Sequence, residues 1–418
     1  MNRKIYLLML FLSITLWGYA QNKHAKQSRF PSYKGLVMTG YQGWFNAKGD
    51  GGDRGWNHYG QIDQKNAGIE IWPEMTEYKV TYKTPFKLAN GDHAQLFSSY
   101  DDSSVQLHFK WMKDYGIDGA FIQRFIANLK YKQGINHNNK VLTTAFDAAE
   151  KNKRAIAIMY DFSGMKEGDE KIVIDDFKKL VDDLKITNRG NKQSYLYHNG
   201  KPLVALWGVG FNDNRKYSLK NVQTIINFLQ NDPVYGGCSI LLGVPTQWRE
   251  LTGDTMNDPE LLEMFKKADI IHPWFVGRFT EARLPKMMER IKGDIAWCKT
   301  NKVDYVPVIY PGFSWHNMKP ESPLDQIPRN RGQFFWKQLS GAIQNGAEMI
   351  YLAMFDEVDE GTAIFKISKN PPVGNVEFVK PEEDIPSDYY LYLSGYAAKM
   401  LRKEVPFQSK IPAPILKK

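Results

Sequence analysis

Short apolar stretches rich in β-branched residues alternate with longer amphipathic stretches along almost the whole chain. Eight of the short stretches have the nearly continuous apolar character of strands that are covered on both faces. They are residues 35–43, 119–125, 155–160, 203–207, 239–244, 270–274, 306–310 and 349–355. Because strands that alternate with helices form parallel sheets, this pattern predicts an α/β fold.

The amphipathic stretches between these strands predict eight helices. They are residues 104–115, 141–153, 174–184, 219–229, 259–267, 284–298, 332–346 and 389–402. Gly116 and Gly346 lie at the ends of two of them, where a glycine suits the left-handed conformation of a helix cap. Eight strand–helix units in a chain of 418 residues predict a single closed (β/α)8 TIM barrel with extended loops at its carboxyl-terminal face.

The alternative to a barrel is an open, doubly wound sheet, which the same alternation permits. Such sheets commonly carry a glycine-rich loop that holds phosphate, and neither Gly-x-Gly-x-x-Gly nor Gly-x-x-x-x-Gly-Lys-Ser/Thr follows any predicted strand. We therefore favour the barrel. Residues 48–104 contain no predicted long helix and are interpreted as an extended loop, either a site element or a lid. Residues 21–418 are expected to form one domain, with two domains as the alternative at this length.

The amino terminus has the pattern of a secretory signal peptide. Arg3 and Lys4 precede an apolar run over residues 5–17, and Gly18, Tyr19 and Ala20 follow it. The apolar run is shorter than the roughly 20 residues that a membrane-spanning helix needs, so a membrane anchor is the weaker interpretation. We expect cleavage near Gln21 and export to the periplasm or beyond. No cysteine follows the run that could accept a lipid.

The formal charge of +9 raises the question of a nucleic-acid partner. The lysines are scattered among acidic residues, and no dense basic run stands out apart from Lys417 and Lys418 at the end of the chain, so no nucleic-acid partner is expected. The two cysteines, Cys238 and Cys298, lie in apolar stretches, where a disulfide and two buried free thiols are both compatible with export.

Polar and aromatic residues follow most of the predicted strands, at the end where the active sites of such barrels are built. Aromatic rings beside amides, a guanidinium and carboxylates suit a sugar, whose apolar face packs on a ring while its hydroxyls need hydrogen-bond partners. For a single tryptophan, capping of the core is the simpler interpretation, and for His272 a structural role is equally compatible. The predicted substrate-binding residues are Tyr41, Trp44, Gln123, Arg124, Asp161, Trp207, His272, Trp274, Tyr310, Trp315 and His316.

Four acids, Asp356, Glu357, Asp359 and Glu360, follow the last predicted strand. Glycoside hydrolysis needs two carboxyl groups, one of which protonates the leaving oxygen. Four carboxylates close together beside a buried strand cannot all ionise freely, and a raised pKa is what a general acid requires. A solvated turn and a calcium site are the alternatives, although the spacing is not that of an EF-hand loop.

The segment Glu357-x-x-Glu360-Gly361-Thr362 resembles the glutamate pair of glycoside hydrolase family 99, the endo-α-mannosidases, and more loosely that of family 71, the α-1,3-glucanases. This resemblance implies an eightfold barrel, no metal or cofactor, and retention of configuration through a 1,2-anhydro sugar. It implies that Glu357 deprotonates the neighbouring 2-hydroxyl and that Glu360 is the general acid/base. Asp161 and Tyr41 are similar to family residues that follow the third and first strands.

The chain departs from the mannosidases between the two glutamates, where Val358 and Asp359 replace Trp-His. The sequence thus predicts a retaining glycoside hydrolase that cleaves an α-linked glycan or polysaccharide. The alternatives are a carbohydrate-binding barrel without turnover and an inverting hydrolase. Zinc-dependent and serine-type hydrolysis lack their usual motifs, since no His-Glu-x-x-His or Gly-x-Ser-x-Gly occurs.

Overall fold

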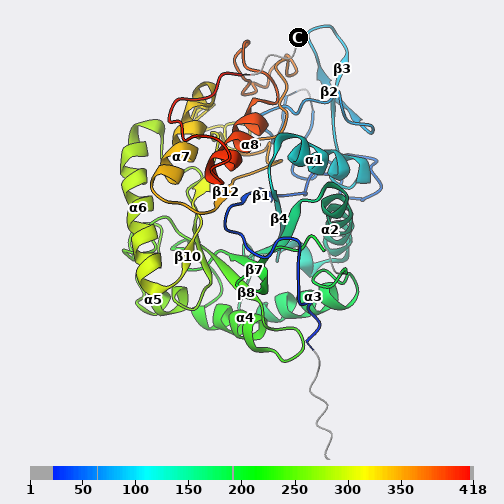
Figure 1. Cartoon of the computed structure of the whole chain (residues 1–418). Coiled ribbons are helices and arrows are strands. Elements are labelled where there is room, and N and C mark those ends of the chain that lie inside the picture. The colour runs from blue at the N-terminus through cyan, green and yellow to red at the C-terminus, as the bar shows by residue number, and fades with distance from the viewer. Residues whose placement is uncertain (1–21, 64, 191–192, 415–418) are drawn as a thin grey trace, which may run out of the picture.

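The structure is a computed structural model that describes residues 22–63, 65–190 and 193–414. A ring of parallel strands forms its centre, and the helices lie outside this ring (Figure 1). The predicted signal peptide, residues 1–20, lies outside the described residues.

The parallel strands occupy eight positions around the ring, and each position overlaps one of the eight predicted stretches. Their bounds are β1 Val37–Tyr41, β4 Gly119–Phe125, β5 Ala155–Asp161, β7 Lys201–Trp207, β8 Ser239–Val244, β9 Ile270–Pro273, β10 Asp304–Tyr305 with β11 Val308–Ile309, and β12 Ile350–Leu352. Neighbours pair in the order β10, β9, β8, β7, β5, β4, β1, β12 and β11. The short β6, Tyr197–His198, pairs antiparallel with β7.

The ring closes through β10 and β11, which are two halves of one strand separated only by Val306 and Pro307. β10 pairs with β9 on one side, and β11 pairs with β12 on the other. The backbone hydrogen bonds between strands continue across Val306 and Pro307. The Val306 N–H donates to the Ile271 carbonyl at 2.9 Å, and the Tyr351 N–H donates to the Pro307 carbonyl at 3.1 Å. The prediction of a closed eightfold barrel is therefore confirmed, and the open doubly wound sheet is excluded.

One α-helix follows each strand position of the ring in the described chain. The helices are α1 Asp102–Tyr115, α2 Lys132–Asn152, α3 Glu170–Asp182, α4 Leu219–Asn231, α5 Glu260–Phe265, α6 Leu284–Asn301, α7 Gln333–Gln344 and α8 Tyr389–Leu401, with 3-10 turns at η1 Asn128–Lys130, η2 Glu281–Arg283 and η3 Asn330–Gly332. Gly116 adopts φ 82° at the end of α1, as predicted. α2 begins before the predicted residue 141 because its first turns are largely polar and give little periodic signal.

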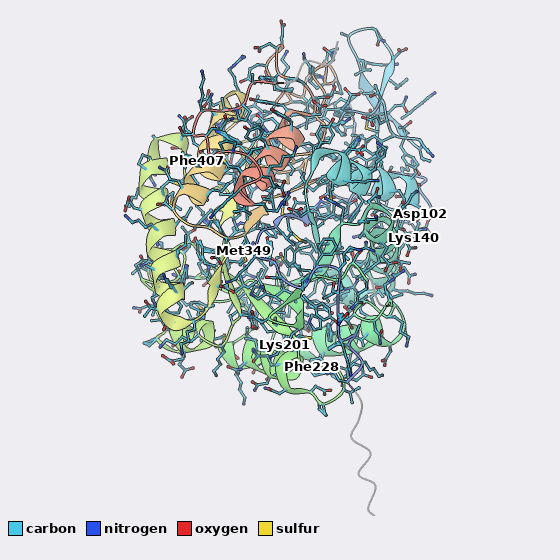
Figure 2. All side chains as sticks on the ribbon, viewed as in Figure 1. Asp102, Lys140, Lys201, Phe228, Met349 and Phe407 are labelled. Atoms are coloured by element: carbon cyan, nitrogen blue, oxygen red, sulfur yellow. The ribbon has the colours of Figure 1, made fainter. Side chains whose placement is uncertain are left out.

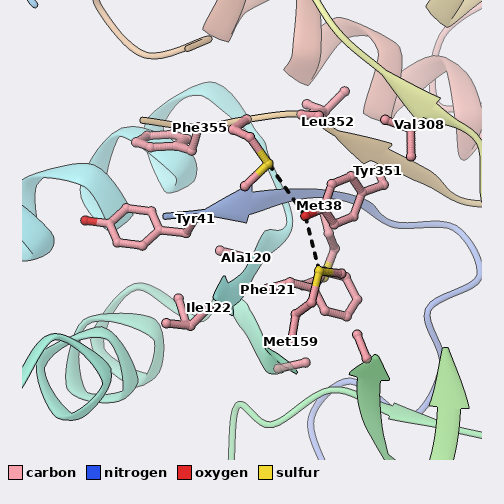
Figure 3. Packing of buried hydrophobic residues seen from close by; sticks show 14 of the residues in the cluster. Met38, Tyr41, Ala120, Phe121, Ile122, Met159, Val308, Tyr351, Leu352 and Phe355 are labelled. Atoms are coloured by element: carbon pink, nitrogen blue, oxygen red, sulfur yellow. Dashed lines mark hydrogen bonds between the residues drawn. The ribbon is translucent and has the colours of Figure 1, made fainter. Parts of the chain in front are cut away.

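Side chains fill the inside of the ring, so the barrel has a packed core (Figures 2 and 3). Met38, Phe121 and Tyr351 are fully buried there, and burial of each such side chain stabilises the fold by about 1.5–3 kcal/mol. The Tyr351 hydroxyl lies 3.8 Å from the Met159 sulfur. A Cβ atom at Gly40 would lie 2.2 Å from the same hydroxyl, so glycine is required where β1 passes this ring.

The segment between β1 and α1 contains an antiparallel hairpin, β2 Tyr82–Lys87 and β3 His93–Leu96, which the sequence analysis did not predict. The hairpin stands at the edge of the barrel (Figure 1). Trp72 and Phe86 pack edge to face with each other and with Phe378 near the carboxyl terminus. The predicted extended loop is therefore anchored to the barrel by aromatic packing.

The outer layer of helices is joined by polar contacts at the surface. Asp102 at the start of α1 pairs with Lys140 of α2 at 2.5 Å, and the two residues lie next to each other in Figure 2. None of the helices in the described ranges is long and apolar enough to cross a membrane. Cys238 and Cys298 are both free and buried, so of the two interpretations the structure has the free thiols.

Candidate active site

A cavity of about 350 Å³ lies at the carboxyl ends of the barrel strands. Eight of the predicted site residues line it: Trp44, Gln123, Asp161, Trp207, Trp274, Trp315, Glu357 and Glu360. A larger hollow of about 1110 Å³ lies beside residues 22–27, but no Asp or Glu of the described chain lines it. The smaller cavity is the one that joins carboxyl groups to aromatic walls.

Glu357 is 3% exposed and is held by two donors. The Gln42 side-chain amide donates to Oε1, and the Thr362 hydroxyl donates to Oε2 at 2.5 Å. Burial raises the pKa of Glu357 well above its usual range, and the charges of Glu360 and Asp359 add to this effect. The bonds from Thr362 and Gln42 oppose the rise, because both favour the ionised carboxylate.

Glu360 is partly exposed to the cavity. Burial raises the pKa of Glu360 to about 8, with the charge of Asp359 as the next cause and the Lys319 cation acting in the opposite direction. The Lys319 ammonium lies 3.6 Å from the centre of the Trp315 ring, which forms part of the cavity wall. Burial thus raises the pKa of both glutamates, while the hydrogen bonds from Gln42 and Thr362 favour the ionised form of Glu357.

The other two acids of the run, Asp356 and Asp359, make contacts with neighbouring parts of the protein. The Asp356 carboxylate accepts hydrogen bonds from the backbone N–H groups of Gln42 and Gly43, both at 2.8 Å. The Asp359 carboxylate lies 3.1 Å from Nδ1 of His58. Asp356 and Asp359 are 0% and 3% exposed, which contradicts the interpretation of the run as a solvated turn. No three His, Cys, Asp or Glu side chains of the described residues are grouped to hold a metal ion.

Tryptophans form much of the cavity wall. Trp207 and Trp274 meet edge to face with their centroids 5.3 Å apart, and Trp44 packs against Phe125 at 5.0 Å. Arg215 lies over the Trp207 ring at 5.2 Å. Such a wall offers apolar ring faces beside polar groups, which is the combination that binds the two kinds of surface on a sugar.

Two solved structures of the GH99 endo-α-mannosidase from Bacteroides thetaiotaomicron, one in complex with bis-tris propane, resemble this chain with TM-scores of 0.64 and 0.63. Each alignment covers 89% of this chain and 99% of the mannosidase at 16% sequence identity. The chain has the fold of glycoside hydrolase family 99. A family described as a domain of unknown function, DUF5010, matches residues 190–375, and no curated protein matches the chain.

The predicted resemblance to family 99 is thus confirmed at the level of the fold. The carboxylate that the resemblance assigned after the third strand, Asp161, lines the cavity and is 8% exposed. Burial raises the pKa of Asp161 to about 6, and the Ser163 N–H donates to its carboxylate at 2.7 Å. Tyr41, the other assigned residue, is fully buried and its hydroxyl lies 2.8 Å from Nδ1 of His108, outside the cavity.

Four further residues predicted to bind substrate also lie outside the cavity lining. Arg124 points to the helix layer, where its guanidinium bonds Asp176, because neighbouring residues of a strand face opposite sides. The Tyr310 hydroxyl donates to a backbone carbonyl at 2.6 Å in the core. His316 contacts the Ser322 carbonyl at 2.8 Å.

His272 is the fourth of these residues and lies inside the barrel. It is fully buried, and its ring meets that of Tyr351 edge to face at 4.4 Å. Burial lowers the pKa of His272 to about 3, so the imidazole is neutral. This residue belongs to the core and does not reach the cavity.

Sequence reasoning missed several residues that shape the site. Gln42 directly follows β1, and this position at a strand end marks it in the sequence, but it was not among the predicted substrate-binding residues. His58 and Glu70 come from the segment between β1 and α1, where no strand end marks them. The Glu70 carboxylate accepts hydrogen bonds from the Ser314 hydroxyl and the Asn317 N–H, both at 2.6 Å.

Proposed function

We propose that the protein is a retaining glycoside hydrolase that cleaves an α-linked glycan or polysaccharide, with Glu357 and Glu360 as the reacting pair. The observation that carries this proposal is that both carboxyl groups line one tryptophan-walled cavity while their surroundings differ. Glu357 has two hydrogen-bond donors, whereas burial keeps a proton on Glu360 near neutral pH. Two carboxyl groups in unlike environments are what acid–base cleavage of a glycosidic bond requires.

In the proposed reaction Glu360 gives its proton to the glycosidic oxygen as the bond to the anomeric carbon breaks. Glu357 takes the proton from the 2-hydroxyl, and that oxygen closes on the anomeric carbon to form a 1,2-anhydro sugar. Glu360, now a carboxylate, then deprotonates a water that opens the ring, and Glu357 returns its proton to O2. The two inversions give net retention.

The decisive experiment follows the product anomer by NMR during digestion of an α-mannan, in which the 2-hydroxyl lies trans to the glycosidic oxygen so that O2 can close on the anomeric carbon. An α-1,3-glucan, whose 2-hydroxyl is cis and cannot form the anhydro ring, is digested in parallel. We expect the first product to retain the configuration of the substrate. Inversion would refute the anhydro mechanism and favour the inverting alternative. If neither polymer nor any other α-glycan of a digestion screen is cleaved while sugars still bind, the protein is the binding barrel and the proposal fails.

Two variants separate the roles of the glutamates. Glu360→Gln should lose about 100-fold or more on the natural linkage but much less on an aryl glycoside whose leaving group needs no proton. Glu357→Gln should lose activity on both substrates, and a substrate without a 2-hydroxyl should not be cleaved at all. Glu289→Gln, which changes an exposed glutamate of α6, is the matched control and should keep full activity.

We also propose that the enzyme is exported, on the basis of the signal-peptide pattern in residues 1–20. Mass spectrometry of the protein purified from its native host should give an amino terminus near Gln21. An intact terminus at Met1 would contradict export by this signal.

A further inference from the structure

Three residues from separate parts of the chain, Trp44, His58 and Asp359, contact one another in series at one wall of the cavity. Trp44 follows β1 and lines the cavity, and the ring of His58 lies parallel to it with centroids 3.7 Å apart and an interplanar angle of 4°. Nδ1 of His58 lies 3.1 Å from Oδ2 of Asp359, which stands between the two glutamates. A continuous contact thus runs from the loop of the reacting pair to the aromatic wall.

His58 is held in this place against its backbone preference. Its φ is 61°, in the left-handed region that residues other than glycine rarely adopt. Such strain persists only where the surrounding contacts fix the residue, and it is concentrated at functional sites. Here the fixing contacts are the Trp44 ring on one side and the Asp359 carboxylate, whose side chain is 4% exposed, on the other.

We propose that His58 and Asp359 are positioning residues that hold the Trp44 indole as a sugar-stacking wall at a set distance from Glu357 and Glu360. This inference rests on the proposed function, because it assigns a part of the same site. The imidazole covers one face of the indole, and its contact with Asp359 ties that face to the loop that carries Glu357 and Glu360. A shift of the loop that carries Glu357 and Glu360 therefore also moves the Trp44 indole.

The pair also acts on the charge of the site. The titratable and charged groups that influence His58 or Asp359, or that one of them influences, are Arg54, Tyr59, Glu70, His137, Asp356, Glu357 and Glu360. Burial and the Arg54 cation lower the pKa of His58 to about 3, so the imidazole is neutral. Burial raises the pKa of Asp359 well above its usual range, and the Asp359 carboxylate, when ionised, raises the pKa of Glu360.

The substitutions His58→Asn and Asp359→Asn test the aromatic wall and the charge of Asp359 separately, and Trp44→Phe provides a comparison for the wall. His58→Asn removes the stacked ring and keeps a residue type that tolerates a positive φ. It should weaken glycan binding about three- to tenfold, the size of one aromatic contact. Trp44→Phe should have a similar effect, and the double variant should be little worse than either single one. Asp359→Asn keeps the shape and should leave affinity nearly unchanged, but it should move the alkaline limb of the kcat/KM profile to lower pH.

Binding of α-mannan and α-1,3-glucan by calorimetry, in the Glu360→Gln background, measures affinity without turnover. The emission of Trp44 is the difference between the tryptophan emission of the protein with Trp44 and that of the matching Trp44→Phe variant. Quenching of this difference by acrylamide measures the exposure of the Trp44 indole without any ligand. His58→Asn should raise that quenching. A merely structural role would lower the melting temperature without changing KM, the quenching or the pH limb.

The outcomes distinguish the two proposals. Unchanged affinity or unchanged quenching in His58→Asn overturns the positioning role, whether or not the wild type cleaves a glycan. A wild type that binds but never cleaves overturns the proposed function and leaves the positioning role to be decided by affinity and quenching. No binding of any glycan by Glu360→Gln overturns both.

Discussion

Replacement of Glu70 by alanine should destabilise the protein by about 2 kcal/mol. The carboxylate is fully buried and accepts two hydrogen bonds, from the Ser314 hydroxyl and the Asn317 N–H, both at 2.6 Å. Each bond to a charged acceptor contributes about 1.5–3 kcal/mol, and both are lost. The unfavourable burial of the charge offsets part of this loss, since burial is the largest cause that raises the pKa of Glu70. The net loss of stability is therefore about half of the summed contribution of the two hydrogen bonds.

Glu70→Gln should cost much less, about 1 kcal/mol or below, because the amide keeps an acceptor and carries no buried charge. The sign of the pH dependence follows from the raised pKa of Glu70 in the folded protein. The folded state binds the proton more tightly than the unfolded chain, so the free energy of unfolding falls as pH rises above the unfolded value of 4.5. The wild type should therefore lose stability relative to Glu70→Gln between pH 4.5 and the folded pKa.

Urea unfolding at pH 5 and pH 8, followed by tryptophan emission, measures both differences. Glu289→Gln is the control and should change neither. If Glu70→Ala costs less than about 1 kcal/mol, or if glutamine costs as much as alanine, the carboxylate does not brace these loops as argued.

Other predictions follow from the same site and core. The kcat/KM profile should fall above about pH 8 as Glu360 loses its proton, and Glu360→Gln should remove this limb. Gly361→Ala should lower both kcat and the melting temperature, because Gly361 has φ 66° and a Cβ there would lie 3.2 Å from the Ser314 nitrogen; the strain is about 1–3 kcal/mol. Cys238 and Cys298 should react with a thiol reagent only after unfolding, since burial raises the pKa of both thiols; fast reaction of the native protein would contradict their burial.

The ring itself could be predicted because its signals are local. Apolar runs and glycine caps are read within a few residues, and eight repeats of the unit leave few ways to arrange them. Gln123, Asp161 and Trp207 could be assigned to one site because the carboxyl ends of parallel strands meet at one face. Arg124 could have been excluded by the same rule, since it cannot share the inward direction of Gln123.

Residues of the segment between β1 and α1 could not be assigned in this way. His58 meets Asp359 across 301 positions of sequence, and Glu70 meets Ser314 across 244. These contacts depend on how a long insertion folds back over the barrel, and no period or strand end encodes that path. The hairpin β2–β3 was missed for the same reason, because its strands are short and half exposed.

The pairing of the first and last strands explains how one acidic run contains both the proposed reacting pair and a structural carboxylate. β1 pairs with β12, so the ends of the first and last strands lie side by side, and Asp356 fastens them by accepting the N–H groups of Gln42 and Gly43. That clamp brings the Gln42 amide to Glu357 across 315 positions. The environment that distinguishes Glu357 from Glu360 therefore depends on the pairing of β1 with β12, since without this pairing the Gln42 amide would not reach Glu357.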